Sequence, residues 1–198
     1  MTSYKVLIPG YATKTDTGWL ASCTTTLIHD SGKTIVVDPG INREKLLSTL
    51  KQESLAPTEI DMVFLTHHHI DHAFLAALFE KAIVLDGETI YQNDSETDYE
   101  GVIPGTSIQV IPTPGHAYEH TSLVFDTDQG KVVVAADLFW WTDEQEQIVD
   151  DANLLINRDD PFTKDWNALV ESRTKVLAIA DWIIPGHGKI FKNPGKQQ

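Results

Sequence analysis

Short apolar runs separated by polar stretches make up most of this chain. The runs are rich in valine, isoleucine and leucine, which strands favour. They predict strands near residues 4–9, 24–29, 33–37, 61–65, 82–86, 108–111, 121–126, 131–136 and 182–184. Segments with helical spacing predict helices near 42–53, 72–80 and 160–180. This mixture of strands and helices indicates an α/β or α+β fold.

The helix predicted over residues 160–180 has the clearest pattern. Asp160 suits its N-cap, and Pro161 suits its first turn. One face of the helix gathers Trp166, Leu169, Val170, Arg173 and Leu177, of which four are apolar. We therefore expect this face to be the buried one.

One short segment holds His67, His68, His69, Asp71 and His72. Neutral imidazoles and carboxylates are the ligands that zinc and similar divalent ions prefer. Residues two apart in an extended chain point to the same side, so His67 and His69 can reach one ion while His68 points away. Asp71 and His72 follow as the chain turns, and this pair suits a second ion.

This cluster follows the apolar run 62–65 and precedes the helix-forming run 73–79, so we place it on a strand-to-helix loop. Loops at the carboxyl ends of strands are where α/β folds keep their sites. The same arrangement recurs three times, because apolar runs also lead into His116, Asp137 and His187. Four strands that each deliver a candidate ligand form a far more specific signal than any one of them.

The predicted ligands divide into two sets of three and a bridge. The first set is His67, His69 and His116, the second is Asp71, His72 and His187, and the bridging carboxylate is Asp137. Three protein ligands with an open position for water is the pattern of a catalytic metal site. We expect two divalent ions, with zinc favoured and manganese or iron as alternatives, and we expect His68 not to coordinate.

These motifs together resemble the metallo-β-lactamase superfamily of metal-dependent hydrolases. The matching features are the 67–72 segment, His116 in Thr-Pro-Gly-His, Asp137, His187 in Pro-Gly-His-Gly, and an early Val-Val-Asp-Pro-Gly at 36–40. The resemblance covers roughly residues 4 to 191. It implies a single hydrolase domain over residues 1–198, built as a four-layer αββα sandwich with a dinuclear site at one sheet edge.

The resulting prediction is a dinuclear hydrolase in which a metal-bridged hydroxide attacks a thioester, a lactone or a similar small acyl substrate. Metal coordination lowers the pKa of water from 15.7 to about 7, so the metals dominate the chemistry. We expect Asp71 to orient the nucleophile and to handle its proton. A true β-lactamase is not expected, because the resemblance places Asp137 where one major class of those enzymes carries cysteine.

Three other functions stay open. A phosphodiesterase or ribonuclease is the first, because the closest subfamily resemblance has been linked to RNA processing. A net charge of −14 with only 15 lysines and arginines argues against a nucleic-acid partner. A persulfide dioxygenase would use a similar cluster with one iron, and a metal-binding module would use it without catalysis.

Several further residues have two interpretations each. Asp38 starts a turn, and we favour a structural role beside the site over direct ligation. His120 is either a residue at the core edge or a substrate contact. Trp140 and Trp141 directly follow the Asp137 strand, so they either cover the substrate or pack in the core. Trp19 is a candidate to face them across a pocket.

Composition bears on the cellular location and the partners of the protein. A hydrophobic content of 41% is ordinary for a globular chain, and no apolar run reaches the length of a membrane span. The single cysteine, Cys23, excludes an internal disulfide. Residues 1–9 lack the basic start and apolar core of a signal peptide, which favours a cytoplasmic location. We expect a small-molecule substrate and no membrane partner; the oligomeric state is left open.

Overall fold

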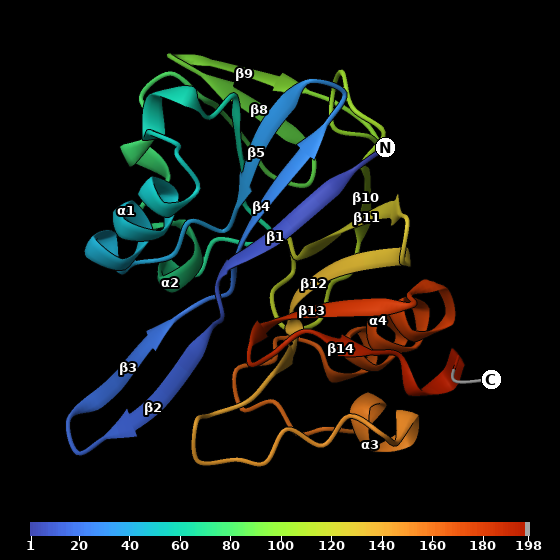
Figure 1. Cartoon of the computed structure of the whole chain (residues 1–198). Helices are drawn as coiled ribbons and strands as arrows, with labels where there is room; N and C mark the ends of the chain where they lie inside the picture. Colours follow the sequence, from blue (N-terminus) through green and yellow to red (C-terminus); the bar gives the residue numbers. More distant parts are fainter. Residues whose placement is uncertain (197–198) are drawn as a thin grey trace.

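A computed structural model describes residues 1–196 and consists mainly of two facing β-sheets (Figure 1). The larger sheet has the order β1 (Ser3–Ile8), β4 (Thr25–Asp30), β5 (Lys33–Val37), β6 (Met62–Phe64), β7 (Ile83–Leu85), β8 (Thr89–Gln92) and β9 (Ser95–Asp98). The smaller sheet has the order β10 (Gln109–Pro112), β11 (Thr121–Thr127), β12 (Gly130–Trp140), β13 (Trp182–His187) and β14 (Phe191–Lys192). A hairpin of β2 (Tyr11–Thr15) and β3 (Gly18–Ser22) stands apart from both sheets.

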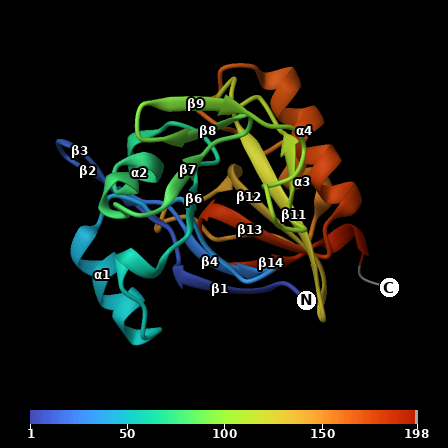
Figure 2. The same cartoon turned by 90° about the horizontal axis from the view of Figure 1, so that it is seen from above.

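The helices cover the outer faces of the two sheets. They are α1 (Arg43–Gln52), α2 (Ile70–Ala73), α3 (Ala152–Ile156) and α4 (Trp166–Ile179), with short 3₁₀ turns at Pro57–Glu59, Ala76–Leu78 and Pro194–Lys196. Figure 2 shows α1 and α4 on opposite sides of the strands. None of the helices within residues 1–196 is both long enough and apolar enough to cross a membrane.

Alternating side chains divide the buried residues into three layers of core. Along β5, Ile35 and Val37 face the core between the sheets, while Val36 packs with Leu46 and Leu50 of α1. The valines of β12 divide in the same way between the central core and the core under α3 and α4. The four-layer αββα sandwich predicted from the sequence is therefore confirmed.

Parallel pairing brings several strand ends to one edge of the sandwich. β5 runs parallel to β6 and β6 to β7 in the larger sheet, and β12 runs parallel to β13 in the smaller sheet. The loops that follow these strands therefore meet at their common carboxyl edge. This edge carries the candidate site.

Some predicted elements differ from the structure. The helix expected over 72–80 is the short α2 followed by a 3₁₀ turn, and α4 begins at Trp166, several residues after the predicted start. The N-cap of α4 is Asp165, whose side chain accepts a hydrogen bond from Ala168 N at 3.0 Å. Asp160 does not cap this helix, because its carboxylate binds a histidine instead.

The β2–β3 hairpin, which the apolar pattern does not indicate, projects from the body of the molecule beside the site (Figure 1). Its base is hydrogen-bonded to the end of β13. Thr24 N donates to Gly186 O at 2.6 Å, and Gly188 N donates to Gly10 O at 3.0 Å. A Cβ atom at Gly10 would lie only 2.1 Å from Gly186 O, so this close approach requires glycine.

Candidate metal centre

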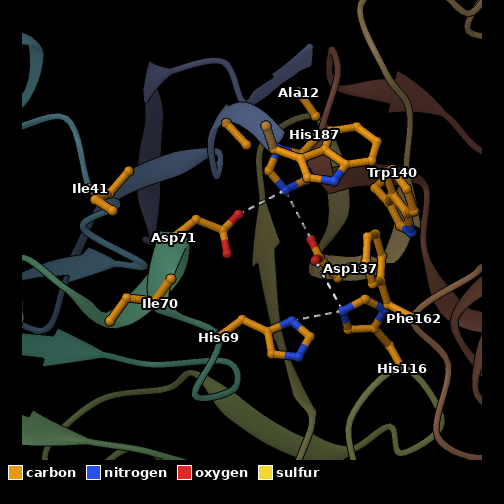
Figure 3. Close-up of a pocket in the computed structure, with 12 residues that line it drawn as sticks. Ala12, Ile41, His69, Ile70, Asp71, His116, Asp137, Trp140, Phe162 and His187 are labelled. Atoms are coloured by element: carbon orange, nitrogen blue, oxygen red, sulfur yellow. Dashed lines mark hydrogen bonds and ion pairs between the residues drawn. The ribbon is translucent and has the colours of Figure 1, made fainter. Parts of the chain in front are cut away.

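The structure brings together all seven residues that the sequence proposes as metal ligands. His67 and His69 lie in the loop after β6, Asp71 and His72 in α2, His116 in the loop after β10, Asp137 in β12, and His187 at the end of β13. Ligand atoms within 4.8 Å of one another form two groups, which are His67, His69, His116 and Asp137, and Asp71, His72 and His187. Figure 3 shows the exposed side of this arrangement.

The Asp137 carboxylate lies between the two groups and presents a different oxygen to each. Its Oδ2 is 3.7 Å from His67 Nε2 and 3.2 Å from His116 Nε2. Its Oδ1 is 3.2 Å from His72 Nε2 and 3.7 Å from His187 Nε2. Burial raises the pKa of Asp137, but His72 and His187 outweigh it and hold this pKa well below its usual range, so the group is an anion.

Two of these imidazoles are fixed by buried carboxylates. His72 Nδ1 donates to Asp38 Oδ2 at 2.9 Å, and His116 Nδ1 donates to Asp160 Oδ2 at 2.7 Å. Each bond leaves Nε2 as the nitrogen with the lone pair in the neutral ring. Burial lowers the pKa of His116, but the carboxylates of Asp137 and Asp160 outweigh it and raise the pKa to about 9.

The other two imidazoles are fixed by a hydroxyl and a carbonyl. The Thr66 hydroxyl donates its one hydrogen to Asp38 Oδ2 at 2.7 Å, so it accepts from His67 Nδ1 at 3.0 Å. His187 Nδ1 donates to the carbonyl oxygen of Tyr11 at 3.1 Å. In the neutral form that a metal ion binds, all four histidines would direct the Nε2 lone pair at this one carboxylate.

This donor set fits divalent ions. Among the described residues, His67 Nε2, His72 Nε2 and Asp137 Oδ1 are buried atoms without a hydrogen-bond partner. Ligand atoms at about 2.0–2.1 Å from a tetrahedral ion lie about 3.3 Å apart, close to the separations around Asp137. Buried lone pairs that face an anion require a cation or protons between them, so the residues fit one ion in each group.

His68 and His120 lie outside the cluster of proposed ligands. His68 Nε2 is 3.2 Å from Asp86 Oδ2 and faces away, in line with the prediction that it does not coordinate. His120 is buried behind the His67 ring, where its Nδ1 pairs with Thr113 Oγ1 at 3.0 Å. Burial, together with His116, lowers the pKa of His120 to about 3. His120 does not line the pocket, so it is not placed to contact a substrate.

A pocket of about 400 Å³ opens over the centre. It is lined by Ala12, Trp19, Ala21, Ile41, His69, Ile70, Asp71, His116, Asp137, Trp140, Phe162 and His187. Of the two adjacent tryptophans, only Trp140 lines it. Trp141 packs in the core against Phe191, with the Arg158 guanidinium 4.8 Å from its ring. Trp140 is the last residue of β12 and Trp141 is the first residue after it, and their side chains take different surroundings.

Sequence reasoning missed Asp160, Phe162, Ile41 and Ile70 as parts of the site. Asp160 and Phe162 belong to the loop before α4, which docks on the residue preceding His116 because Lys164 N and Asp165 N both donate to Gly115 O. Nothing in the local sequence indicates that contact. The Asp-Pro pair at the loop instead resembles the start of a helix.

Comparison with known proteins identifies the family. A family model described as "Metallo-beta-lactamase superfamily" matches residues 18–91. The Xenopus laevis protein named metallo-beta-lactamase domain-containing protein 1 is 34% identical over 96% of this chain and 81% of its own length. The chain belongs to the metallo-β-lactamase superfamily. Members of this superfamily are metal-dependent hydrolases, so the chain is a member of an enzyme family.

For other superfamily members, the match to this chain covers a smaller share of their own length. The mouse metallo-beta-lactamase domain-containing protein 1 is 32% identical over 80% of this chain, and this chain spans 60% of it. The hydroxyacylglutathione hydrolase of Psychromonas ingrahamii is 32% identical over 50% of this chain and 42% of its own length.

Solved structures share the metallo-β-lactamase fold. A putative metallo-beta-lactamase from Thermotoga maritima has a TM-score of 0.70 at 20% identity, covering 96% of this chain and 99% of that one. The chemotaxis sensor ODP, described as a peroxy diiron species, has a TM-score of 0.66 at 16% identity, covering 98% and 87%. The dizinc quorum-quenching lactonase AidC, in complex with a product N-hexanoyl-L-homoserine, has a TM-score of 0.59 at 15% identity, covering 86% and 74%.

Proposed function

We propose that this chain is a dinuclear metal-dependent hydrolase of a thioester, a lactone or another small acyl substrate. The observation that carries the proposal is the convergence of four fixed histidine lone pairs on both oxygens of the buried Asp137. His67, His69 and His116 would hold one ion, Asp71, His72 and His187 the other, and Asp137 both. A donor set of imidazoles and carboxylates favours zinc, with manganese or iron as alternatives.

When bound, the ions supply a water that ionises near neutral pH and a positive charge that polarises the acyl oxygen. Asp71 is the residue placed to manage protons. One of its oxygens is 3.3 Å from His187 Nε2, and the other points away from His187 (Figure 3). We assign to this carboxylate the removal of a proton from the attacking water and its return to the leaving oxygen or sulfur as the acyl bond breaks.

An acyl substrate agrees with the surroundings of the site. The pocket walls are mainly apolar side chains, which suit an acyl group better than a phosphodiester backbone. Two relatives point the same way by name, since one is a hydroxyacylglutathione hydrolase and another is a lactonase. The net charge of −14 adds long-range repulsion against nucleic acid.

Metal analysis combined with a substrate panel tests the proposal. We expect two zinc ions per purified chain and hydrolysis of thioesters or lactones faster than cleavage of a phosphodiester or of single-stranded RNA. One iron per chain with oxygen consumption on a persulfide would support a dioxygenase instead. RNA cleavage that is efficient at moderate salt, without acyl hydrolysis, would support a nuclease.

Neighbouring histidines provide a matched pair of variants. His69→Ala removes a proposed ligand, so it should lower metal content and reduce kcat by at least about 10²-fold. His68→Ala removes a side chain that faces Asp86, so it should keep both the metal content and the activity. Equal losses in the two variants would contradict the proposed ligand set.

A further inference from the structure

The pocket above the metal centre has apolar walls on two opposite sides. Figure 3 shows Ile41 and Ile70 on one side of the histidines and carboxylates, and Trp140 and Phe162 on the other. The second wall is continuous, because the Trp140 and Phe162 rings are 5.6 Å apart. Trp19 extends it from the β2–β3 hairpin, with its ring 6.1 Å from that of Phe162. A substrate that presents its acyl carbon to the centre would have one wall on each side of the bond that breaks.

Neither wall carries a cationic side chain. Within residues 1–196, the lining of this pocket includes no lysine and no arginine. The arginine nearest in sequence to Phe162 is engaged elsewhere, because Arg158 Nε donates to the carbonyl oxygen of Trp140 at 2.9 Å. Lys45, in the helix that follows Ile41, has its Nζ 4.7 Å from the centre of the Tyr11 ring. A carboxylate or phosphate placed against either wall would therefore lose its water without gaining an ammonium or guanidinium partner.

We propose that the substrate carries uncharged, apolar groups on both sides of the scissile acyl bond, that is, on the acyl chain and on the leaving group. This inference rests on the proposed acyl hydrolase function and narrows its substrate class. It separates the chain from hydrolases of thioesters whose thiol is a charged peptide such as glutathione, because that leaving group would place carboxylates against one wall. It also predicts that longer acyl chains react better until they fill the pocket.

Two matched series of thioesters test the inference on the metal-loaded protein. The first compares octanoyl thioesters of methyl 3-mercaptopropionate and of 3-mercaptopropionate, which differ by one carboxylate on the leaving group. We expect kcat/KM to be at least about tenfold higher for the uncharged methyl ester, which corresponds to about 1.4 kcal/mol. The second series lengthens the acyl chain from butanoyl to octanoyl with the uncharged thiol. We expect kcat/KM to rise by about threefold to fourfold per methylene group that is buried.

A charge placed in one wall should weaken this selectivity. Ile41→Lys introduces an ammonium group into the lining at a side chain that is 37% exposed. It should reduce the preference for the uncharged leaving group by at least about fivefold while the metal content stays at two. Phe74→Lys is the matched control, since Phe74 is 58% exposed and does not line the pocket. This control should change the preference by less than about twofold.

The possible results separate the inference from the function on which it rests. Acyl hydrolysis with equal or better kcat/KM for the carboxylate thioester would overturn the inference and leave the hydrolase function intact. A protein that binds two metals but hydrolyses neither these thioesters nor the lactones of the substrate panel would overturn the acyl hydrolase function. In that case tryptophan fluorescence would still report on the walls, with N-octanoyl-β-alanine methyl ester and N-octanoyl-β-alanine as slowly reacting probes. At least tenfold tighter binding of the methyl ester would uphold uncharged walls, and equal binding would refute them.

Discussion

At the scale of single residues, the metal centre is organised by the nitrogens that face away from it. His72 and His116 donate from Nδ1 to buried carboxylates, His187 donates to a backbone carbonyl, and His67 donates to the Thr66 hydroxyl. These bonds fix the tautomer and the ring orientation of every imidazole that faces Asp137. The fold therefore aligns these four histidines without an ion.

Asp160 is the partner whose removal is most informative. Asp160→Asn keeps the size of the side chain but removes the charge that faces His116 Nδ1 at 2.7 Å. We expect the ion in the group that contains His116 to bind about 10-fold to 100-fold less tightly, with little change in the affinity of the other site. Competitive metal titration against a chelator measures both affinities. Asp159→Asn is the control, because its side chain is exposed, and unchanged affinity in Asp160→Asn would contradict this role.

Asp137 should affect both ions at once. Asp137→Ala removes the one anion that lies between the two groups, so we expect metal content to fall from two ions per chain towards zero, together with activity. Elemental analysis of the purified variant checks this. Two ions retained in Asp137→Ala would show that this carboxylate is only near the centre.

At the scale of elements, β12 shows why sequence reasoning reached the ligands but not the full site. The sequence predicts the valine run as a strand and Asp137 as a ligand. The observed strand continues to Trp140, and its pairing with β13 is interrupted around Ala136, which has a φ of 43°. A non-glycine residue in that conformation costs about 1–3 kcal/mol and depends on surrounding contacts. Asp160 was wrongly predicted as the cap of α4, because the local sequence does not reveal its contact with distant His116.

The exposed elements were missed for a different reason. The β2–β3 and β8–β9 hairpins carry few buried side chains, so they lack the apolar pattern that marks a strand. The buried strands of both sheets carry that pattern and were predicted. Ligand types and their order were thus accessible from the sequence, as were Trp19 and Trp140 of the pocket, whereas Ile41, Ile70 and Phe162 were not.

The close packing of β12 and β13 yields a prediction about Gly186. A Cβ atom at this position would lie 1.7 Å from Asp137 Oδ1. Gly186→Ala should therefore displace the carboxylate and lower metal content by at least half, while the far-ultraviolet circular dichroism stays close to that of the wild type. Gly195→Ala is the control, since its nearest neighbour, Asn193 Oδ1, is 3.4 Å away. Normal metal content in Gly186→Ala would contradict the tight fit.

At the scale of the whole molecule, Asp30 links the N-terminal segment to the loop before β10. It accepts hydrogen bonds from Thr2 Oγ1 at 2.6 Å, Ser107 N at 2.7 Å and Ser107 Oγ at 2.9 Å. The N-terminal strand of the larger sheet and the loop before β10 of the smaller sheet are thereby held together. Burial raises the pKa of Asp30, but these hydrogen bonds outweigh it and lower the pKa to about 2.

This depressed pKa gives a stability prediction with a definite sign. The stabilisation by Asp30 is complete above its ordinary value of 3.8 and is lost as the pH falls through about 2. Asp30→Asn should therefore lower the free energy of unfolding by about 2 kcal/mol at pH 7. Urea unfolding should show this difference shrinking between pH 4 and pH 2. Asp94→Asn, at an exposed position, should show no such difference at either pH.

The contact between the base of the β2–β3 hairpin and the end of β13 also has a consequence for biosynthesis. His187 is the last proposed ligand to leave the ribosome, and its ring is held by Tyr11, one of the earliest residues made. The group of His67, His69, His116 and Asp137 is complete once Asp137 has emerged, whereas the group of Asp71, His72 and His187 must wait for the closing strand. All ligands of the first group are therefore synthesised before the second group is complete.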